Sequence, residues 1–549
     1  MGWGTRRSAA FSAAAVMVSM LVTVGGAGPL EAAPSCAAPV TRVAPAEGFV
    51  IQDPSVSADG TRIAFQSDDD LTGGNADGND EIFLYDADGS TLTQLTSSTQ
   101  GSGVESNWEP SISDDGTKVA FTSDRNYTGA NATGYEIFLW SEAGSTITQL
   151  TDVAAFAFTV TPEISGDGST VVFESDGNVG GLNPSLNYEV FVVNTATTAV
   201  TAVTSTVVEG GGQPTVSADG REVAFSSAGN LTGQNADGST EVFLWDADGG
   251  PSTTQLTNAT TGTADSPSVS AAGNRVAFRS NRANGTGAGD DNFEIFVRDV
   301  AAGTTAAVTT TARGGQNSNW EPSISADGSR VAFTSNRNIG GGNADGSYEI
   351  FVWDRAGAQV AQVTSGATDS QRSTYPSLAA DGGTVAFVSG DFNVDYVLRT
   401  VACALPPRPD ALIATSGAGP FKGGDVYAAT VRRGQTKSQR IARGATRTFH
   451  VQLQNDHGVA DTLKVKGVSS GSAGYTVRYL SGTTDITARV VAGSYSTGVL
   501  APGAAVTIKV KVTASSTAAA GSARNVDVTV RSQTDTSVKD TVRARVTRS

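Results

Sequence analysis

One short pattern of apolar and polar residues repeats along most of the chain. In the stretch from Pro54 to Thr96, the apolar segments are SVS, RIAF, EIFLY and TLTQL, and turn dipeptides such as Asp59-Gly60 lie between them. Short apolar segments bounded by turn residues are typical of β-strands joined by tight hairpins. The pattern therefore predicts four antiparallel strands in each unit.

This unit starts seven times. Its starts are marked by Pro54, Pro110, Pro162, Pro214, Pro267, Pro322 and Pro376, in steps of 56, 52, 52, 53, 55 and 54 residues. A four-stranded meander cannot bury both of its faces alone, so copies at this period are expected to stack as the blades of a propeller. We predict an all-β fold with a seven-bladed β-propeller over residues 34–405. A solenoid of the same units is the alternative.

The ends of the repeat region suggest how the ring closes. The seventh copy supplies three strands and then reaches Cys403, while residues 40–43 precede the first unit as a fourth strand precedes each later unit. We expect this N-terminal segment to complete the last blade. Cys36 and Cys403 flank the repeats, and a disulfide between them would lock the closure in an oxidising compartment. Two unpaired thiols are the alternative.

Both ends of the chain differ from the repeats. Residues 1–33 combine Arg6-Arg7 with an apolar run and then small residues, which is typical of a secretory signal peptide for the general or the twin-arginine route. A proline-rich linker at 406–420 precedes residues 421–549, whose alternating pattern predicts an immunoglobulin-like β-sandwich. We expect a secreted or cell-surface monomer without a transmembrane segment.

Charge divides the chain into two parts. From Ala404 onward there are 20 Lys plus Arg and 8 Asp plus Glu, a net charge of +12. The totals of 37 and 54 leave 17 and 46 for the residues before it, a net charge of −29. Duplex nucleic acid is bound mainly by cations that neutralise phosphates, so this balance argues against nucleic acid as a partner of the repeats. The basic residues of the last domain fit either a solvated face or contact with anionic polymers.

Strand order places loops of unequal length on opposite faces. The turns between strands one and two and between strands three and four are short in every copy and share what we call the short-turn face. The loops between strands two and three and the links between blades share the other side, the long-loop face. Binding residues usually lie on loops carried by a rigid scaffold. Aromatic candidates for binding or packing on the long-loop face are Trp108, Phe156, Phe158, Trp320 and Tyr375.

Acidic residues recur at the start of the third strand. They are Glu81, Glu136, Glu189, Glu241, Glu294 and Glu349, with Asp395 in the seventh copy. Arg125, Arg282 and Arg337 follow the second strand in three copies. An ion pair within each blade is one interpretation, and a ring of carboxylates available for binding is the other.

Three Asn-x-Asp-Gly runs are candidates for calcium. Their residues are Asn75 and Asp77, Asn235 and Asp237, and Asn343 and Asp345. Oxygen-rich loops containing glycine suit a hard cation, but these runs lack the spacing of the helix-flanked calcium loop. Asn-x-Asp-Gly is also common turn chemistry. We expect no obligatory cofactor, with calcium as the ligand to test.

The histidines exclude two kinds of catalytic site within the repeats. His450 and His457 both lie in the C-terminal region. A histidine-dependent metal site and a Ser-His-acid triad are thereby ruled out for the propeller. Carboxylate-pair chemistry stays open, because acids are abundant and no sequence feature selects one pair. We therefore name no catalytic residue.

The repeat PSVSADGTRIAF followed by EIFLYDADGSTLTQLT closely resembles the TolB-type, WD-like propeller repeat, over roughly residues 40–402. Copy five departs from it with Ala272 where the acid of the turn is expected. The resemblance implies a propeller used mainly for protein contacts. TolB itself has six blades and a domain in front, whereas this chain has seven copies and a sandwich behind. The last domain looks like an immunoglobulin-like module of bacterial secreted proteins, which implies display or attachment.

The sequence therefore predicts an exported, non-catalytic binding or scaffolding protein. Its long-loop face would contact a protein or a cell-envelope polymer. The alternative is a carbohydrate-active enzyme, a glycosidase or lyase, that uses carboxylates at the mouth of the propeller channel.

Overall fold

The structure is a computed structural model. It describes residues 41–43, 51–99, 107–129, 134–153, 157–206, 211–248, 250–258, 262–282, 292–311, 319–355, 358–366, 371–391, 395–403, 409–422, 431, 435–455, 460–469, 471–472, 474–501, 504–533 and 539–549. The signal-like residues 1–33, Cys36, Phe156 and His457 lie outside these ranges.

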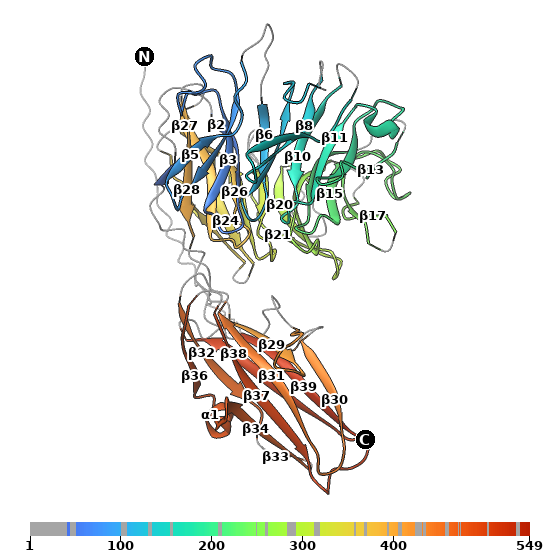
Figure 1. The fold of residues 1–549 in the computed structure, drawn as a ribbon, viewed down its shortest axis with the longest axis vertical. Helices are drawn as coiled ribbons and strands as arrows, with labels where there is room; N and C mark the ends of the chain where they lie inside the picture. The colour runs from blue at the N-terminus through green and yellow to red at the C-terminus, as the bar shows by residue number, and fades with distance from the viewer. Residues whose placement is uncertain are drawn as a thin grey trace, which may run out of the picture.

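Seven four-stranded antiparallel sheets form the propeller, which is the upper body in Figure 1. Blade one consists of β2 (Ile51–Val56), β3 (Arg62–Ser67), β4 (Glu81–Asp86) and β5 (Thr91–Gln94). Blade two consists of β6 (Asn107–Ile112), β7 (Lys118–Ser123), β8 (Glu136–Ser141) and β9 (Thr146–Gln149). Blade three consists of β10 (Thr159–Ile164), β11 (Thr170–Ser175), β12 (Glu189–Asn194) and β13 (Val200–Ala202), with the 3₁₀ helix η1 (Val179–Gly181). Blades four and five are β14 (Gly212–Val216), β15 (Glu222–Ser227), β16 (Glu241–Asp246) and β17 (Ser252–Gln255); and β18 (Ala264–Val269), β19 (Arg275–Ser280), β20 (Glu294–Asp299) and β21 (Thr304–Ala307). Blade six is β22 (Asn319–Ile324), β23 (Arg330–Ser335), β24 (Glu349–Asp354) and β25 (Gln359–Gln362).

Blade seven joins the two ends of the repeat region. Its strands are β26 (Gln371–Leu378), β27 (Thr384–Asp391), β28 (Asp395–Ala402) and β1 (Thr41–Arg42). β1 pairs antiparallel with β28, and Thr41 lies opposite Thr400. The predicted closure by the N-terminal strand is therefore confirmed. Cys403 follows β28, is buried and is disulfide-bonded; the pairing with Cys36 stays a prediction.

Successive side chains of the inner strands pack against different neighbouring blades. Phe65 of β3 packs with Leu398 of blade seven, whereas the adjacent Ala64 packs with Val119 of blade two. Side chains alternate between the two faces of a strand, and here a blade covers each face. This is why the second and third strands are apolar at nearly every position, although the strands are antiparallel.

A ring of seven backbone hydrogen bonds closes the short-turn face. Each runs from an amide in the first turn of one blade to a carbonyl in the same turn of the next: Ala58 to Asp114, Asp114 to Gly166, Asp167 to Ala218, Ala218 to Ala271, Ala271 to Ala326, Ala326 to Ala380, and Asp381 to Ala58, at 2.8–3.2 Å. Because the seventh bond returns to the first blade, the ring has seven blades.

The first turn of each unit is held by its own side chains. Ser57 donates to Asp59 Oδ1 at 2.9 Å and accepts the amide of Arg62 at 3.0 Å, while Gly60 takes a φ of 76°. Copy five has no acid at this position, and there Ser270 donates instead to Asn274 Oδ1 at 3.0 Å. The departure from the repeat therefore leaves the turn intact.

The C-terminal region is a two-sheet β-sandwich. One sheet has the order β29 (Pro409–Ala414), β31 (Thr446–Asn455), β37 (Ala505–Ala514), β34 (Tyr475–Ser481) and β33 (Gly471–Ser472), with β35 (Thr484–Asp485) beside β34. The other has the order β30 (Thr436–Ile441), β39 (Lys539–Arg548), β38 (Ala523–Ser532), β32 (Asp461–Gly467) and β36 (Tyr495–Leu500). A short helix, α1 (Thr487–Ala492), completes it. The two inner faces bury one apolar core.

The sandwich begins earlier than the sequence predicted. Strand β29 lies inside the segment 406–420 that was assigned to a linker, yet it pairs with β31 over its whole length. Its alternation was hidden by the flanking prolines. No helix among the residues that the structure describes is long and apolar enough to cross a membrane.

Candidate functional site

The first strand of every blade carries a β-bulge near the long-loop face. In blade one, the pairing of β2 with β3 shifts register between Gln52 and Ser55. The residue before the unit proline then has positive φ, between 48° and 54°, in Asp53, Glu109, Thr161, Gln213, Ser266, Glu321 and Tyr375. Non-glycine residues rarely adopt this conformation, which clusters at functional sites. We call these seven residues the bulge ring.

The bulge ring stands at the mouth of a central channel. First-strand residues of all seven blades line a cavity of ≈ 450 Å³. Its described lining includes the acids Asp53, Glu109, Asp114 and Glu163 and no lysine, arginine or histidine. The interior of the propeller therefore presents negative or protonated carboxyl groups and hydroxyls.

Burial raises the pKa of several of these acids. The pKa of Asp53 rises to about 7, first because burial disfavours the charged form and then because Glu109 and Glu321 lie near. Burial also raises the pKa of Glu174, on β11, to about 7 and that of Glu163 to about 8. The mouth therefore holds carboxyl groups that titrate near neutral pH.

Side-chain oxygens of one blade hold the bulge-ring amide of the next blade at five junctions. The amide of Glu109 donates to Gln66, that of Thr161 to Glu109, that of Gln213 to Glu174, that of Ser266 to Gln213 and that of Tyr375 to Glu321, at 2.7–3.1 Å. Asp53 differs, because its carboxyl forms no hydrogen bond with the described residues. It is the ring carboxyl best placed to act on a ligand.

Aromatic candidates form a continuous run across blades two and three. The ring of Trp108 lies 5.4 Å from that of Tyr135, and Tyr135 stacks on Phe158 at 5.0 Å. Phe158 remains 44% exposed. The sequence had offered binding or packing for these residues, and here Trp108 packs while Phe158 keeps a free face.

A second aromatic group lies on blades six and seven. Trp320 lies 5.1 Å from Tyr348, and the guanidinium of Arg372 lies over the Tyr348 ring at 4.7 Å. Tyr375 is a member of the bulge ring and is 41% exposed. Burial, followed by the nearby Glu321, raises its pKa to about 12.

Sequence reasoning missed an exposed apolar patch on blade three. The loop after β11 places Leu182, Leu186 and Tyr188 at 40%, 63% and 44% exposure, close in sequence to η1. We call Phe158, Leu182, Leu186 and Tyr188 the blade-three patch. One signal was available, because this loop reads GLNPSLNY where three other copies have Asn-Ala-Asp-Gly.

The acids at the start of the third strands are buried. Glu81, Glu136, Glu189, Glu241, Glu294 and Glu349 are 0–1% exposed. Glu81, for example, accepts hydrogen bonds from the Ser98 amide at 2.6 Å and from Asn107 Nδ2 at 3.0 Å, so it fixes the link to the next blade. Burial raises the pKa of Glu136 to about 7. This placement favours a structural role over a ring of carboxylates that bind a partner.

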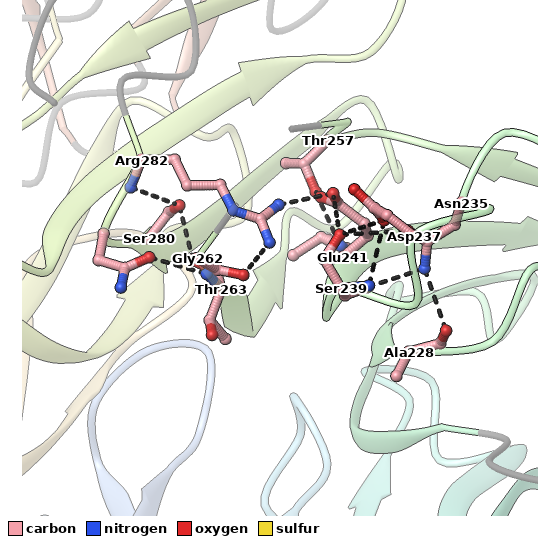
Figure 2. A network of polar contacts seen from close by, with 12 residues as sticks. Ala228, Asn235, Asp237, Ser239, Glu241, Thr257, Gly262, Thr263, Ser280 and Arg282 are labelled. Atoms are coloured by element: carbon pink, nitrogen blue, oxygen red, sulfur yellow. Dashed lines mark hydrogen bonds and ion pairs between the residues drawn. The ribbon is translucent and has the colours of Figure 1, made fainter. Parts of the chain in front are cut away.

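The acidic partner of Arg282 comes from a different blade than predicted. Arg282 of blade five donates to Glu241 of blade four at 2.5 Å, and both side chains are at most 3% exposed (Figure 2). The sequence had suggested a pair within one blade. The difference arises because the residues after the second strand lean toward the preceding blade.

The calcium candidates fold as turns. Asn235 Nδ2 donates to the carbonyl of Ser239 at 2.8 Å, while Asp237 Oδ1 accepts the Ser239 hydroxyl at 2.8 Å (Figure 2). Asn343, Asp345 and Ser347 repeat these contacts. In blade one, Asn75 makes the same carbonyl contact, and Asp77 is exposed. No group of three or more His, Cys, Asp or Glu side chains placed to hold a metal occurs among the described residues.

Comparisons with known proteins concern the fold. No protein-family model and no curated protein matches the chain. Among solved structures it is similar to an oligogalacturonate lyase in complex with manganese (16% identity, TM-score 0.46, 67% of this chain and 93% of that one). It is also similar to a puromycin-hydrolysing peptidase of Mycobacterium tuberculosis (13%, 0.43, 74% and 64%) and to the β-propeller domain of Myceliophteria thermophila Cps50 (Swd1) (10%, 0.41, 66% and 98%). At such identities the likeness says nothing about activity.

Proposed function

We propose that the protein is an exported, non-catalytic binding protein that contacts a protein or a cell-envelope polymer through its long-loop face. One observation carries this proposal. Six large hydrophobic side chains are exposed in the described part of the chain, and five of them, Phe158, Leu182, Leu186, Tyr188 and Tyr375, lie on the long-loop face. Large exposed apolar side chains that share one face of a protein indicate an interaction surface.

The surroundings of the blade-three patch support the same function. The patch continues inward through Tyr135 and Trp108 toward the acidic channel mouth. Aromatic side chains contribute large contact areas with little loss of conformational freedom, which suits them to binding. The signal-like segment supports export, and the TolB-type resemblance supports a protein as the partner.

A matched pair of variants tests this function. Phe158→Ser/Leu186→Ser/Tyr188→Ser removes most of the blade-three patch, and Val499→Ser removes the exposed apolar residue of the sandwich, which is 76% exposed. Each immobilised protein is incubated with solubilised cell-envelope and culture fractions, and bound material is identified by mass spectrometry and sugar analysis.

We expect a component that the unchanged protein and Val499→Ser retain and that the triple variant loses. The loss is expected because burial of three such side chains at an interface contributes several kcal/mol, at roughly 25 cal/mol per Å² of apolar area. Equal retention by all three proteins, or no specific component with any of them, would contradict a binding role for this face.

A carbohydrate-active enzyme is the second candidate, and Asp53 is the observation that favours it. Its carboxyl has a pKa of about 7 and faces the channel without a hydrogen bond to the described residues. A carboxylic acid that stays protonated near neutral pH can protonate the leaving oxygen of a glycosidic bond. Glu109 and Glu321 would then be the neighbouring carboxyls to examine as its partner.

Fragment release from a panel of neutral and acidic polysaccharides tests the enzyme. Activity lost in Asp53→Asn and kept in Asp88→Asn, an exposed turn residue, would establish this function and replace the non-catalytic one. No release by the unchanged protein between pH 5 and pH 8 would remove it.

A further inference from the structure

The sandwich carries three basic side chains in one row on the outer face of the sheet that contains β39. Cross-strand register places Lys464 of β32 opposite Arg531 of β38, and Arg531 opposite Lys539 of β39. Neighbouring strands lie about 4.8 Å apart, so three positive charges fall within about 10 Å across the sheet. The residues on either side of them along the strands, such as Leu463 and Val530, point into the core. We call Lys464, Arg531 and Lys539 the cation row.

No side chain of the cation row makes a hydrogen bond or ion pair with the described part of the chain, and all three residues are at least partly exposed. Like charges directly opposite one another on a sheet repel and lower its stability. The row therefore has an unfavourable internal charge arrangement that no acid among the described residues relieves.

The same face shows that the sheet can compensate such a charge. Four residues from Arg531 along β38, Asp527 faces Arg543 of β39, and the guanidinium donates to both carboxylate oxygens at 2.6 and 2.8 Å. The cation row has the same geometry with a basic residue at every position. This contrast is what distinguishes it from scattered surface charge.

We propose that the cation row is a binding site for an anionic polysaccharide that carries carboxylate or sulfate groups along its chain. Cross-strand register holds the three cations in one row across the sheet, which suits an extended polymer. The arginine fork can bind a carboxylate or sulfate group in bidentate fashion, while each lysine supplies a point charge. This site lies on a different domain from the long-loop face and does not depend on its function.

The net charge of the whole protein favours a polysaccharide over nucleic acid. The chain carries −17, which repels a duplex of high charge density at moderate ionic strength. A polysaccharide with one charge on each sugar or fewer is repelled less. Three aligned cations can then provide enough local attraction to hold it.

The opposite outer face of the sandwich offers a matched control. Arg478, Lys509 and Lys511 lie there on neighbouring strands, and Arg478 has an acidic partner, Asp485, at 3.6 Å. Lys464→Gln/Arg531→Gln/Lys539→Gln and Arg478→Gln/Lys509→Gln/Lys511→Gln each remove three positive charges. Any difference between these two variants therefore reflects the place of the charges and not their number.

Binding of the full chain is measured on immobilised alginate, a carboxylate polymer, with neutral dextran and duplex DNA in parallel, at 50 and 300 mM salt. We expect binding to alginate that weakens with salt, no binding to dextran, and affinity lowered about one-hundredfold in the cation-row variant, at about one order of magnitude for every one to two charges. The control variant should bind within a few-fold of the unchanged protein.

A single charge reversal separates binding from folding. Arg531→Glu places an acid between two lysines, so we expect a higher Tm at low salt together with loss of alginate binding. A lower Tm with unchanged binding would overturn the proposal. So would absence of alginate binding by the unchanged protein, equal losses in both triple variants, or tighter binding to DNA than to alginate.

Discussion

The two ends of the propeller channel are built from the same seven repeats in different ways. At the short-turn end, the blades are joined by seven hydrogen bonds between backbone atoms, which any residue except proline can donate. At the long-loop end, the bulge ring has one backbone conformation in every blade but contains six residue types, and side chains complete its hydrogen bonds. The repeat therefore fixes the backbone at both ends and leaves side-chain chemistry free to vary at one. That end is where we place function.

Two acids, one near each end, have pKa values shifted in opposite directions. At the short-turn end, burial would raise the pKa of Asp59, but hydrogen bonds from Thr61 and Ser57 outweigh it and lower the pKa. At the long-loop end, burial dominates and raises the pKa of Glu174 to about 7. The turn at Asp59 therefore stabilises a carboxylate, whereas the surroundings of Glu174 stabilise a carboxylic acid.

The largest expected effect is on the free energy of unfolding, when one ion pair from each end of the channel is broken. Arg282→Met should lower the free energy of unfolding by about 3–5 kcal/mol, because it leaves the buried Glu241 carboxylate without its cation. At the short-turn end, Arg221 pairs with Asp248 with both side chains more than half exposed, and Arg221→Met should leave stability nearly unchanged, because solvent screens an exposed ion pair. Urea unfolding of both variants at pH 7 makes the comparison, and equal losses would contradict it.

The second prediction concerns pH. A carboxyl whose pKa is raised by folding stabilises the protein below its ordinary pKa, and this stability is lost as pH rises through the folded value. Glu174 should therefore reduce stability between about pH 4.5 and pH 7, by on the order of 1–3 kcal/mol. Glu174→Gln should flatten this decline, because glutamine still accepts the Gln213 amide without ionising.

Asp59 should respond at the other end of the pH scale. Its lowered pKa stabilises the fold above the ordinary value of 3.8, and that stability is lost as pH falls below it. Asp59→Asn should change the dependence of stability on pH only in this acidic range. Unfolding curves between pH 3 and pH 8 for both variants will show whether the two limbs separate, and a Glu174→Gln curve parallel to that of the unchanged protein would argue against the assignment.

The third prediction tests strain in the bulge ring. Ser266 has a φ of 49°, which glycine adopts without penalty, so Ser266→Gly should raise stability by about 0.5–1 kcal/mol after the entropy cost of glycine. Ser268, two residues away on the same strand, accepts the Ile324 amide at 3.1 Å, and Ser268→Gly should lower stability by about 1–2 kcal/mol. Thermal unfolding that moves in the same direction for both would contradict strain at the ring.

The smallest effect is expected at the Asn-x-Asp-Gly turns. Asp237 and Asp345 already accept hydrogen bonds within their turns, so adding a chelator or millimolar calcium should leave Tm unchanged. Isothermal titration with calcium provides the direct measurement. Saturable binding that Asp237→Asn/Asp345→Asn removes would establish a metal site instead.

The fold was predictable because its signals are local. In most units, a proline at the start and an Asp-Gly turn mark the strands. The missing strand of copy seven indicated that residues 40–43 complete the last blade. Strand β29 was not predicted, because the prolines beside its six residues led us to assign this segment to a linker. The alternation of residues 421–549 likewise predicted a sandwich, although its immunoglobulin type stays a prediction.

The site was less predictable because its properties arise from the ring. The raised pKa of the Asp53 carboxyl depends on burial inside the ring and on Glu109 and Glu321, which lie more than 50 residues away in the sequence. The same holds for Arg282, whose partner Glu241 belongs to another blade. Exposure of Leu186 also could not be read from its neighbours in sequence, since it depends on what the rest of the blade leaves uncovered.

The closure of blade seven has a mechanical consequence. β1 is two residues long and antiparallel to β28, so the chain enters and leaves the ring at the same edge, next to Thr41 and Cys403. A force pulling these two ends apart would break the hydrogen bonds between β1 and β28 one after another and not all together. Tension transmitted from the sandwich would then open blade seven before any other junction, and a covalent bridge at Cys403 would carry that load in place of the strand.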